Sequence, residues 1–198
     1  MVDTAGPVFR SPVGSTISGG PLSVTDHTDT SKLVVHASGD GPTAQALGVR
    51  FARACRLAHA GGPPRLVVGT RPFEWLIIAE RGQAPSIRAE LPDDPAASVV
   101  DLTHGRALLR VTGTPSARLL ARLCNVDLSD DMTPDLAAFS GSVAGLMCDL
   151  VREDVEGDRS YLICFDRSYA GWFAGVVVDA ATRLCQEEQQ ARRLPWRS

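Results

Sequence analysis

Two segments of the chain resemble each other, and this internal repeat restricts the folds that the sequence can adopt. Residues 23–35, SVTDHTDTSKLVV, resemble residues 98–110, SVVDLTHGRALLR. The matched pairs, 75 positions apart, are Asp26 with Asp101, Thr28 with Thr103 and Leu33 with Leu108. Each copy has two short apolar runs around a polar link, and a Gly/Pro break follows it. This pattern is typical of two strands that lead into a turn.

A second pair of segments extends the repeat. Residues 75–81, WLIIAER, resemble residues 161–167, YLICFDR, at an offset of 86 positions. A sheet formed by one copy has an apolar face that it cannot bury alone, whereas two copies bury that face together. We therefore predict an α+β fold in which one domain, residues 22–188, consists of two similar halves, 22–96 and 97–188. Each half is expected to run β-β-α-β-β-α, or to be a permutation of a split βαβ unit.

Hydrophobic periodicity and turn residues place the individual elements. Strands are expected at residues 22–26, 33–36, 65–70, 75–80, 98–102, 107–111, 140–153 and 161–166. Helices are expected at residues 43–59, at 84–91, from Pro115 onward after a Thr114 N-cap, and at 168–188 with Ser168 as the cap. Residues 1–21 are rich in Gly, Ser and Pro and are expected to form an extended arm, loose or laid on a partner. Residues 189–198 are a polar tail, in which Trp196 is a candidate partner anchor.

Composition excludes several classes of protein. The chain of 198 residues has 44% hydrophobic and 22% charged residues, which is ordinary for one globular domain. A net charge of −3 argues against nucleic acid as the main partner. No apolar run reaches the roughly 20 residues of a membrane-spanning helix, and the N-terminus lacks a signal pattern. The five cysteines are odd in number and never spaced as CxxC, which predicts reduced thiols and a cytoplasmic location.

The sequence contains no recognisable catalytic or metal-binding motif. It has no GxSxG elbow, and His27, His36, His59 and His104 are not spaced as metal ligands. The glycines before the predicted helices do not form GxGxxG or GxxxxGK[ST], so they are interpreted as strand-to-helix turns rather than phosphate loops. We therefore assign no catalytic residue and no metal ligand to this chain.

Carboxylates near strand ends are the remaining candidates for chemistry. These residues are Asp26, Glu74, Asp101 and Asp149. A carboxylate there could bind a pterin-like ring, whose guanidine edge offers two parallel N–H donors. It could equally pair with Arg106 or Arg110 and close a strand link. Because Asp26 and Asp101 occupy matched positions, a fold requirement shared by both halves explains them more simply than one active site.

Three motifs, in order along the chain, resemble a known family. The run VVDLTHGRALLRVTGTPSARLLARLCNVDL is similar to the central signature of the gamma subunit of heterotetrameric sarcosine oxidases. RPFEWLIIA resembles that family's Gly-Pro-Asp-Glu-Trp-Leu-Leu segment, and YLICFDRSYAGWF resembles its Phe-x-x-x-Val-x-Arg-Ser-Phe-Ala-x-Tyr-Leu segment. The resemblance covers about residues 22 to 181. Arg71-Pro72-Phe73 departs from the pattern, and the N-terminal half matches weakly.

The resemblance implies a fold, a function and partners. The fold would be that of the folate-binding domain of glycine-cleavage aminomethyltransferase, a pseudo-duplicated α+β unit. The chain would carry no cofactor or catalytic residue of its own and would pack against a large alpha-type subunit. Partner subunits would hold flavin and NAD. The heterotetramer would demethylate sarcosine oxidatively and pass the one-carbon unit to tetrahydrofolate.

Two alternatives remain open. The first is a stand-alone folate-dependent one-carbon transfer enzyme, or a folate-binding protein, on the same fold. In that case the cofactor-binding candidates are Glu74, Asp101 and Asp149, and one of them would face an open pocket between the halves. The second alternative is a structural or regulatory domain without a ligand.

Overall fold

The computed structural model describes residues 9–18, 20–59 and 62–193, and within them ten strands and four α-helices follow one pattern twice. The first half contains β1 (Ser23–Asp26), β2 (Ser31–His36), α1 (Pro42–Leu47), β3 (Ala54–His59), β4 (Gly62–Arg71), β5 (Glu74–Ala79) and α2 (Ala84–Glu90). The second half contains β6 (Ser98–Asp101), β7 (Arg106–Thr112), α3 (Ser116–Leu120), β8 (Ala138–Val143), β9 (Leu146–Arg152), β10 (Ser160–Asp166) and α4 (Ala170–Arg193). A 3₁₀ turn, Arg167–Tyr169, precedes α4.

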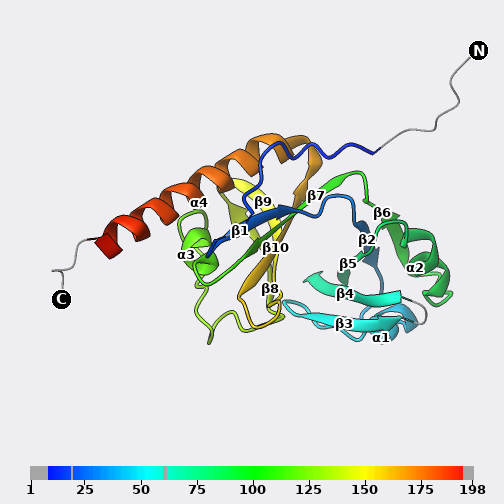
Figure 1. The fold of residues 1–198 in the computed structure, drawn as a ribbon. Coiled ribbons are helices and arrows are strands. Elements are labelled where there is room, and N and C mark those ends of the chain that lie inside the picture. Colours follow the sequence, from blue (N-terminus) through cyan, green and yellow to red (C-terminus); the bar gives the residue numbers. More distant parts are fainter. Residues whose placement is uncertain (1–8, 19, 60–61, 194–198) are drawn as a thin grey trace, which may run out of the picture.

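The ten strands form two antiparallel sheets that exchange one strand (Figure 1). Sheet A has the order β1-β7-β10-β9-β8, and sheet B has the order β6-β2-β5-β4-β3 when read from its equivalent edge. The two orders match element by element. The first strand of each half, however, pairs with the second strand of the other half. The predicted pseudo-duplicated α+β fold is therefore present, and the exchange joins its halves into one unit.

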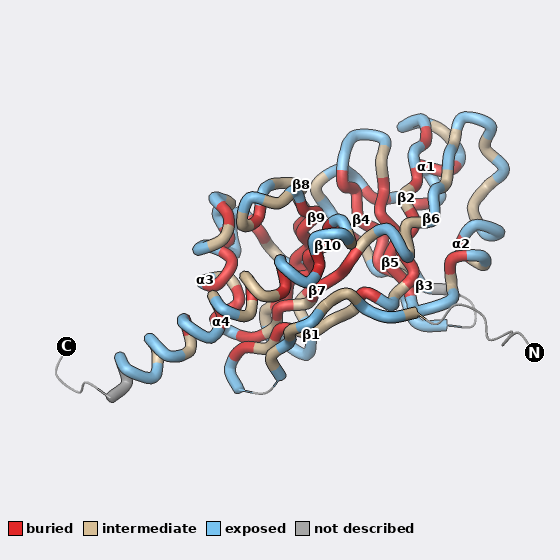
Figure 2. The backbone as a smooth tube through the Cα atoms, turned by 90° about the horizontal axis from the view of Figure 1, so that it is seen from above, coloured by how far each residue is buried: buried red, intermediate tan, exposed pale blue. Residues whose placement is uncertain are grey.

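Three apolar clusters divide the molecule into four layers, helix–sheet–sheet–helix. One cluster lies between sheet A and helices α3 and α4, and it includes Phe165, Phe173 and Leu184. A second lies between sheet B and helices α1 and α2, and it includes Trp75 and Ile87. The third lies between the sheets. Burial follows the layers, while the C-terminal part of α4 extends past the sheet and is largely exposed (Figure 2).

The predicted helix over residues 43–59 is wrong. Helix α1 ends at Leu47 because Gly48 adopts a left-handed φ of 61°, and residues 54–59 form strand β3 against β4. The helix is indicated by Leu47, Phe51, Ala54 and Ala58, which lie 4, 3 and 4 positions apart. This spacing would have required Phe51 to be buried, yet it is 57% exposed. Each half consequently has three strands between its two helices, one more than the sequence indicated.

Other element boundaries differ in smaller ways. The predicted strand at residues 140–153 is a hairpin, β8–β9, whose turn uses Ala144 and Gly145 at positive φ. Helix α3 has five residues and is preceded by Pro115 as the cap residue. Asp166, rather than Ser168, caps the C-terminal helical segment, because its carboxylate accepts the Ser168 N–H at 2.8 Å. Helix α4 continues to Arg193 and so includes the first residues of the predicted polar tail.

The repeat holds, but its spacing is not constant. Strands β5 and β10 match as predicted, because Trp75 and Tyr161 both face the helices of their own half. Leu33 and Leu108, by contrast, point to opposite faces of their sheets, since Leu33 packs toward the helices and Leu108 between the sheets. Asp26 pairs with Leu109 and Asp101 with Leu33, so the matched positions of β2 and β7 are 76 apart and the second copy has one extra residue between its first two strands. A one-residue shift exchanges the faces of a strand.

The described part of the N-terminal arm lies on its own chain. Ile17 and Val24 exchange two backbone hydrogen bonds of 2.9 and 2.8 Å, so the arm covers the outer edge of β1. Val13 and Ile17 pack against the core of sheet A. Trp196, the candidate anchor, lies outside the described residues. In the described ranges, no helix combines the length and apolarity needed to cross a membrane.

Candidate functional site

The two links that carry the chain between the sheets are stabilised by equivalent carboxylates. Asp26 Oδ1 accepts the Thr28 N–H at 2.9 Å, and Asp101 Oδ1 accepts the Thr103 N–H at 2.9 Å. Burial tends to raise the pKa of Asp101, but hydrogen bonds from Thr103 outweigh it and lower the pKa. Both residues thus form Asx turns at matched positions. Neither makes an ion pair with Arg106 or Arg110 among the described residues.

Lys32, the only lysine of the sequence, is fully buried where the two links cross. Its Nζ donates to the carbonyl oxygens of Thr28 at 2.9 Å and Thr30 at 2.6 Å. Burial lowers the pKa of Lys32, and the nearby Arg167 charge lowers it further. Because these partners are backbone carbonyls, Lys32 stabilises the link, and its amine is not exposed to a substrate.

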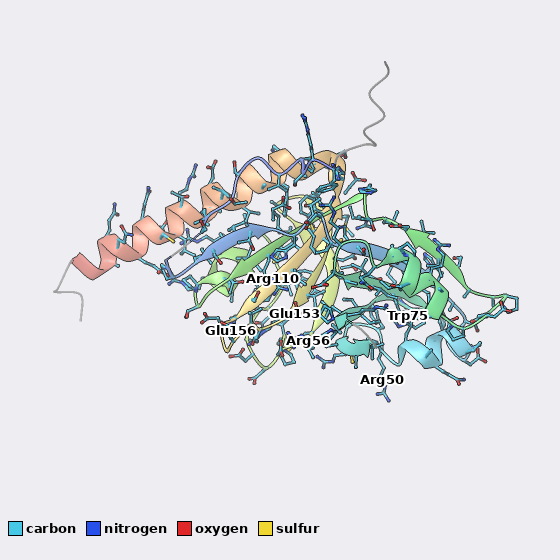
Figure 3. The ribbon with its side chains drawn as sticks, turned by 45° about the vertical axis from the view of Figure 1, so that its right-hand side comes forward. Arg50, Arg56, Trp75, Arg110, Glu153 and Glu156 are labelled. Carbon is cyan, nitrogen blue, oxygen red and sulfur yellow. The ribbon has the colours of Figure 1, made fainter. Side chains whose placement is uncertain are left out.

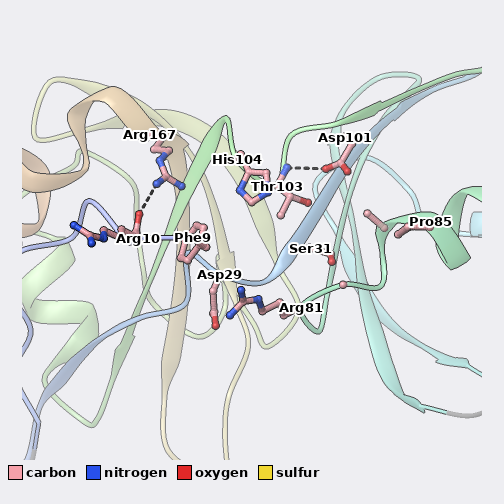
Figure 4. Close-up of a pocket in the computed structure, with 12 residues that line it drawn as sticks. Phe9, Arg10, Asp29, Ser31, Arg81, Pro85, Asp101, Thr103, His104 and Arg167 are labelled. Atoms are coloured by element: carbon pink, nitrogen blue, oxygen red, sulfur yellow. Dashed lines mark hydrogen bonds between the residues drawn. The ribbon is translucent and has the colours of Figure 1, made fainter. Parts of the chain in front are cut away.

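A pocket of about 620 Å³, called the axial pocket below, opens beside these links. Its polar side chains come from both halves and include Asp29, Arg81, Asp101, His104 and Arg167 (Figure 4). The volume lies within the range of about 300–1,000 Å³ that is typical of small-molecule sites. Of the three predicted site carboxylates, only Asp101 lines this pocket.

An aromatic ring from the N-terminal arm contacts both arginines of the axial pocket. The guanidinium carbons of Arg81 and Arg167 lie 5.8 and 4.9 Å from the centre of the Phe9 ring (Figure 4). Both distances fall within the range of cation–π attraction. Arg167 Nη2 also donates to the carbonyl oxygen of Arg10 at 2.5 Å, whereas its buried Nη1 has no hydrogen-bond partner among the described residues.

The other two predicted carboxylates lie together in a separate cluster at one end of the sheets. Asp149 Oδ1 accepts the Ser140 hydroxyl at 2.5 Å, and Asp149 Oδ2 accepts from Arg106 Nη1 at 3.2 Å. Glu74 pairs with Arg71, which also lies 3.8 Å from Asp149. Burial alone would raise the pKa of Glu74. The hydrogen bond from Thr70 and the charge of Arg71 outweigh burial and lower this pKa. The adjoining pocket measures about 170 Å³.

A second ionic cluster connects the two sheets. Glu153 accepts from Arg110, which lies in sheet A, and from Arg56 Nε of sheet B at 3.0 Å (Figure 3). Arg110 also donates to the Ser160 hydroxyl at 2.9 Å. The arginines that the sequence offered as partners of strand-end carboxylates therefore pair with Asp149 and Glu153 rather than with Asp101.

The cysteines and possible metal ligands form no reactive arrangement within the described ranges. All five cysteines are free thiols, and burial raises the pKa of Cys148 and Cys164 to about 12. Such thiols stay protonated and unreactive at neutral pH. In residues 9–18, 20–59 and 62–193, no group of three or more His, Cys, Asp or Glu side chains could hold a metal ion.

Sequence reasoning did not identify the arginines of the axial pocket. Arg81 and Arg167 occupy matched positions at the ends of the WLIIAER and YLICFDR segments. The repeat was therefore a usable signal for the pair, but it gave no indication that the two side chains share one cavity. Phe9 had no sequence signal, because it lies in an arm that matches no repeat.

Comparisons with known proteins establish the fold. No protein-family model and no curated protein matches the sequence. The structure of heterotetrameric sarcosine oxidase from Corynebacterium sp. U-96, in complex with pyrrole 2-carboxylate, contains a similar chain. The TM-score is 0.69 at 22% identity, over 85% of this chain and 88% of that chain. Glycine cleavage system aminomethyltransferase T from Bartonella henselae matches with a TM-score of 0.59 at 17% identity, over 78% of this chain and 45% of that chain.

This chain has an aminomethyltransferase-like fold. The structural neighbours therefore confirm the fold relationship that the sequence motifs predicted. In the Bartonella enzyme the matched region is less than half of the chain, whereas in the sarcosine oxidase it is nearly the whole of one chain. The aminomethyltransferase-like fold thus occurs both inside a larger enzyme and as a chain of this size.

Proposed function

We propose that the chain is a non-catalytic, gamma-type subunit of a heterotetrameric, sarcosine-oxidase-like complex. Partner subunits would carry the flavin and NAD and would demethylate the amine oxidatively, with one-carbon transfer to tetrahydrofolate. The observation that carries the proposal is the match over 85% of this chain and 88% of a chain from the heterotetrameric oxidase. A similarity of this extent fits a chain that occupies the place of a whole subunit.

The polar groups of the chain support a role without chemistry of its own. Glu74 and Asp149 are held by arginine and hydroxyl donors of the same chain, and Asp101 by a backbone N–H. A general acid, a general base or a folate-binding carboxylate must have an oxygen that can reach the ligand. Interactions within the chain engage both oxygens of Glu74 and Asp149 and one oxygen of Asp101.

An exposed apolar groove supports a protein partner. The groove measures about 470 Å³ and lies where residue 53 bridges to residue 137 and so connects the two sheets. Its walls include Phe51, 57% exposed, and Met132, 66% exposed, with Arg53 and Asp127 also lining it. An apolar centre with polar residues beside it is the usual anatomy of a protein interface. We assign this groove to the large flavin-bearing subunit of the complex.

The proposal predicts that a flavin-bearing subunit is encoded beside this chain, and co-expression of the two proteins tests it. We expect the two to co-elute in a fixed ratio, with flavin absorbance in the same peak. The double substitution Phe51→Ser/Met132→Ser should weaken association by about tenfold or more, because buried aromatic and large apolar anchors dominate interface energies. Val100→Ser is the matched control, since Val100 is 46% exposed on β6, at the other edge of sheet B. Separate elution of the wild-type chains would contradict the proposal.

The folate-binding alternative receives less support from the pocket geometry. The pocket beside Asp149 is about 170 Å³, which is smaller than a typical ligand site. The axial pocket is large enough, but the guanidinium donors of Arg81 and Arg167 line it beside the carboxylates of Asp29 and Asp101, and Thr103 already donates to Asp101. A pterin guanidine edge itself donates hydrogen bonds and requires acceptors. Calorimetric titration of the isolated chain with tetrahydrofolate tests this alternative, and saturable binding that Asp149→Asn or Asp101→Asn abolishes without unfolding would favour it.

A further inference from the structure

We propose that the axial pocket is a binding site for a small organic anion that presents a carboxylate or a phosphate to Arg81 and Arg167. The proposal concerns the isolated chain and does not require a partner subunit. It rests on four features of the pocket: two arginines that form no ion pair with the described residues, an unsatisfied buried donor, an aromatic support for the arginines, and a suitable volume.

The first feature is the lack of ion pairs on the two arginines. Neither Arg81 nor Arg167 forms a salt bridge with any carboxylate of the described part of the chain, although Asp29 and Asp101 line the same pocket. Asp101 is already engaged by Thr103. Most other arginines near the sheets are paired, as Arg106 and Arg110 are. Within the described residues, the axial pocket therefore holds two guanidinium groups that no carboxylate contacts at ion-pair distance, with Asp29 and Asp101 as its more distant negative charges.

The second feature is a buried donor that has no acceptor. Arg167 Nη1 is buried and makes no hydrogen bond to any residue that the structure describes, while Nη2 of the same guanidinium donates to the Arg10 carbonyl. Leaving a buried donor unsatisfied is costly, and the cost is larger for a charged group. Because Nη1 has almost no accessible surface, an oxyanion in the pocket would accept from it once the Arg167 guanidinium turns toward the cavity. Arginine is suited to this role because its planar fork matches the geometry of carboxylate and phosphate oxygens.

The third feature is that the arginines are supported before any ligand binds. Phe9 lies within cation–π distance of both guanidinium groups, so one ring restrains two side chains that come from different halves of the fold. Restraining flexible side chains in advance lowers the entropy that binding would otherwise cost. The N-terminal arm, through Phe9 and Arg10, thus forms one wall of the site.

The fourth feature is the size and lining of the cavity. A volume of about 620 Å³ exceeds what a bare inorganic ion needs and lies within the range of organic ligands. Phe9, Ala84 and Pro85 supply apolar surface beside the arginines. We therefore expect an anionic head group attached to an apolar or planar body, and the repulsion from Asp29 favours a ligand with a single anionic group.

Calorimetric titration of the purified full chain tests the site. The probes are benzoate, phenyl phosphate and inorganic phosphate, with benzamide as the neutral control. We expect saturable binding of benzoate or phenyl phosphate at micromolar to millimolar concentrations and weaker binding of inorganic phosphate. A preference for benzoate or for phenyl phosphate would identify the head group. Equal affinity for benzamide, or no saturable binding of any anion, would overturn the proposal.

Substitutions locate the binding to this pocket. Arg81→Gln should lower the affinity for the preferred anion by about tenfold or more, since a charge-assisted hydrogen bond is lost. Arg81 has no hydrogen bond or ion pair within the described ranges, so this change should leave the melting temperature of the free chain nearly unchanged. Arg81→Lys retains the positive charge but lacks the planar guanidinium with its parallel N–H donors, so it should give an intermediate affinity. Arg50→Gln, at an exposed position outside the pocket, is the control. Equal affinities of wild type and Arg81→Gln would overturn the proposal.

Discussion

The hydroxyl of Thr28 accepts the backbone N–H of Leu108 at 3.2 Å, across 80 positions of the sequence. The matched hydroxyl of Thr103 accepts the backbone N–H of Lys32 at 3.1 Å. These reciprocal bonds lie where each half passes its first strand to the sheet of the other half. At this crossing of the two links, threonine hydroxyls therefore accept backbone N–H groups that no neighbouring strand pairs with. This explains why threonine occurs at the same position of both copies of the repeat.

Replacement of Thr28 by valine should destabilise the chain. The change keeps the shape of the side chain but leaves the buried Leu108 N–H without an acceptor, at a cost of about 1–3 kcal/mol. Urea unfolding measures the difference. Thr182→Val is the control, because the Thr182 hydroxyl is exposed on α4 and bonds only within its helix. An equal loss in both variants would contradict the importance of the crossing.

Removal of the Glu153 carboxylate should lower the free energy of unfolding by more than the loss of a surface ion pair does. Glu153 is 8% exposed and neutralises Arg110 and Arg56 between the sheets. Glu153→Ala leaves a partly buried guanidinium without its partner, at a cost of about 3 kcal/mol. Glu187→Ala, which breaks a surface pair with Arg122, should cost less than about 1 kcal/mol. Similar unfolding midpoints for the two variants would show that Glu153 is not a structural connection between the sheets.

Lys32 should resist chemical modification until the chain unfolds. It is the only lysine side chain, its exposed fraction is 0%, and its amine donates to two carbonyl oxygens. Labelling with an amine-reactive ester, followed by peptide mass spectrometry, should modify Lys32 only at denaturant concentrations within the unfolding transition. Fast modification in native buffer would contradict the burial of this residue.

The free energy of unfolding should fall as the pH decreases through the range in which His27 titrates. Burial, aided by the Arg110 charge, lowers the pKa of His27 below 6.5, so the folded chain favours neutral imidazole. The unfolded chain binds more protons in this range, and stability present above about pH 6.5 is lost as the pH falls through the folded pKa. His27→Gln should reduce the slope of unfolding free energy between about pH 7.5 and 5.5. An unchanged slope in His27→Gln would contradict the role of His27.

The sequence predicted the duplicated fold because each copy repeats the same alternation of apolar residues. It did not predict the strand exchange, since β1 presents the same alternation whether it pairs with β2 or with β7. The helical spacing of Leu47, Phe51, Ala54 and Ala58 predicts a helix that continues through residues 54–59. The alternation of Cys55 and Leu57, which pack against sheet B's core, is the strand signal that this spacing concealed.

The candidate site was less predictable than the fold. Glu74 and Asp149 come from different halves, and only the packing of the two sheets brings Arg71 near both. Asp101 could be placed at a strand end, but its Asx turn depends on the conformation of the link. Arg81 and Arg167 were visible as a repeated pair, whereas their common cavity depends on the position of Phe9 in an arm without a sequence signal.

Amide hydrogen exchange of the isolated chain and of its complex with the flavin-bearing subunit tests the proposed role most directly. If the chain docks through the groove around Phe51 and Met132, peptides that cover residues 50–53 and 126–139 should become protected in the complex. Peptides from β6, at the other edge of sheet B, should be unchanged. Protection confined to β6, or no protection anywhere in the chain, would contradict a docking subunit that binds through this groove.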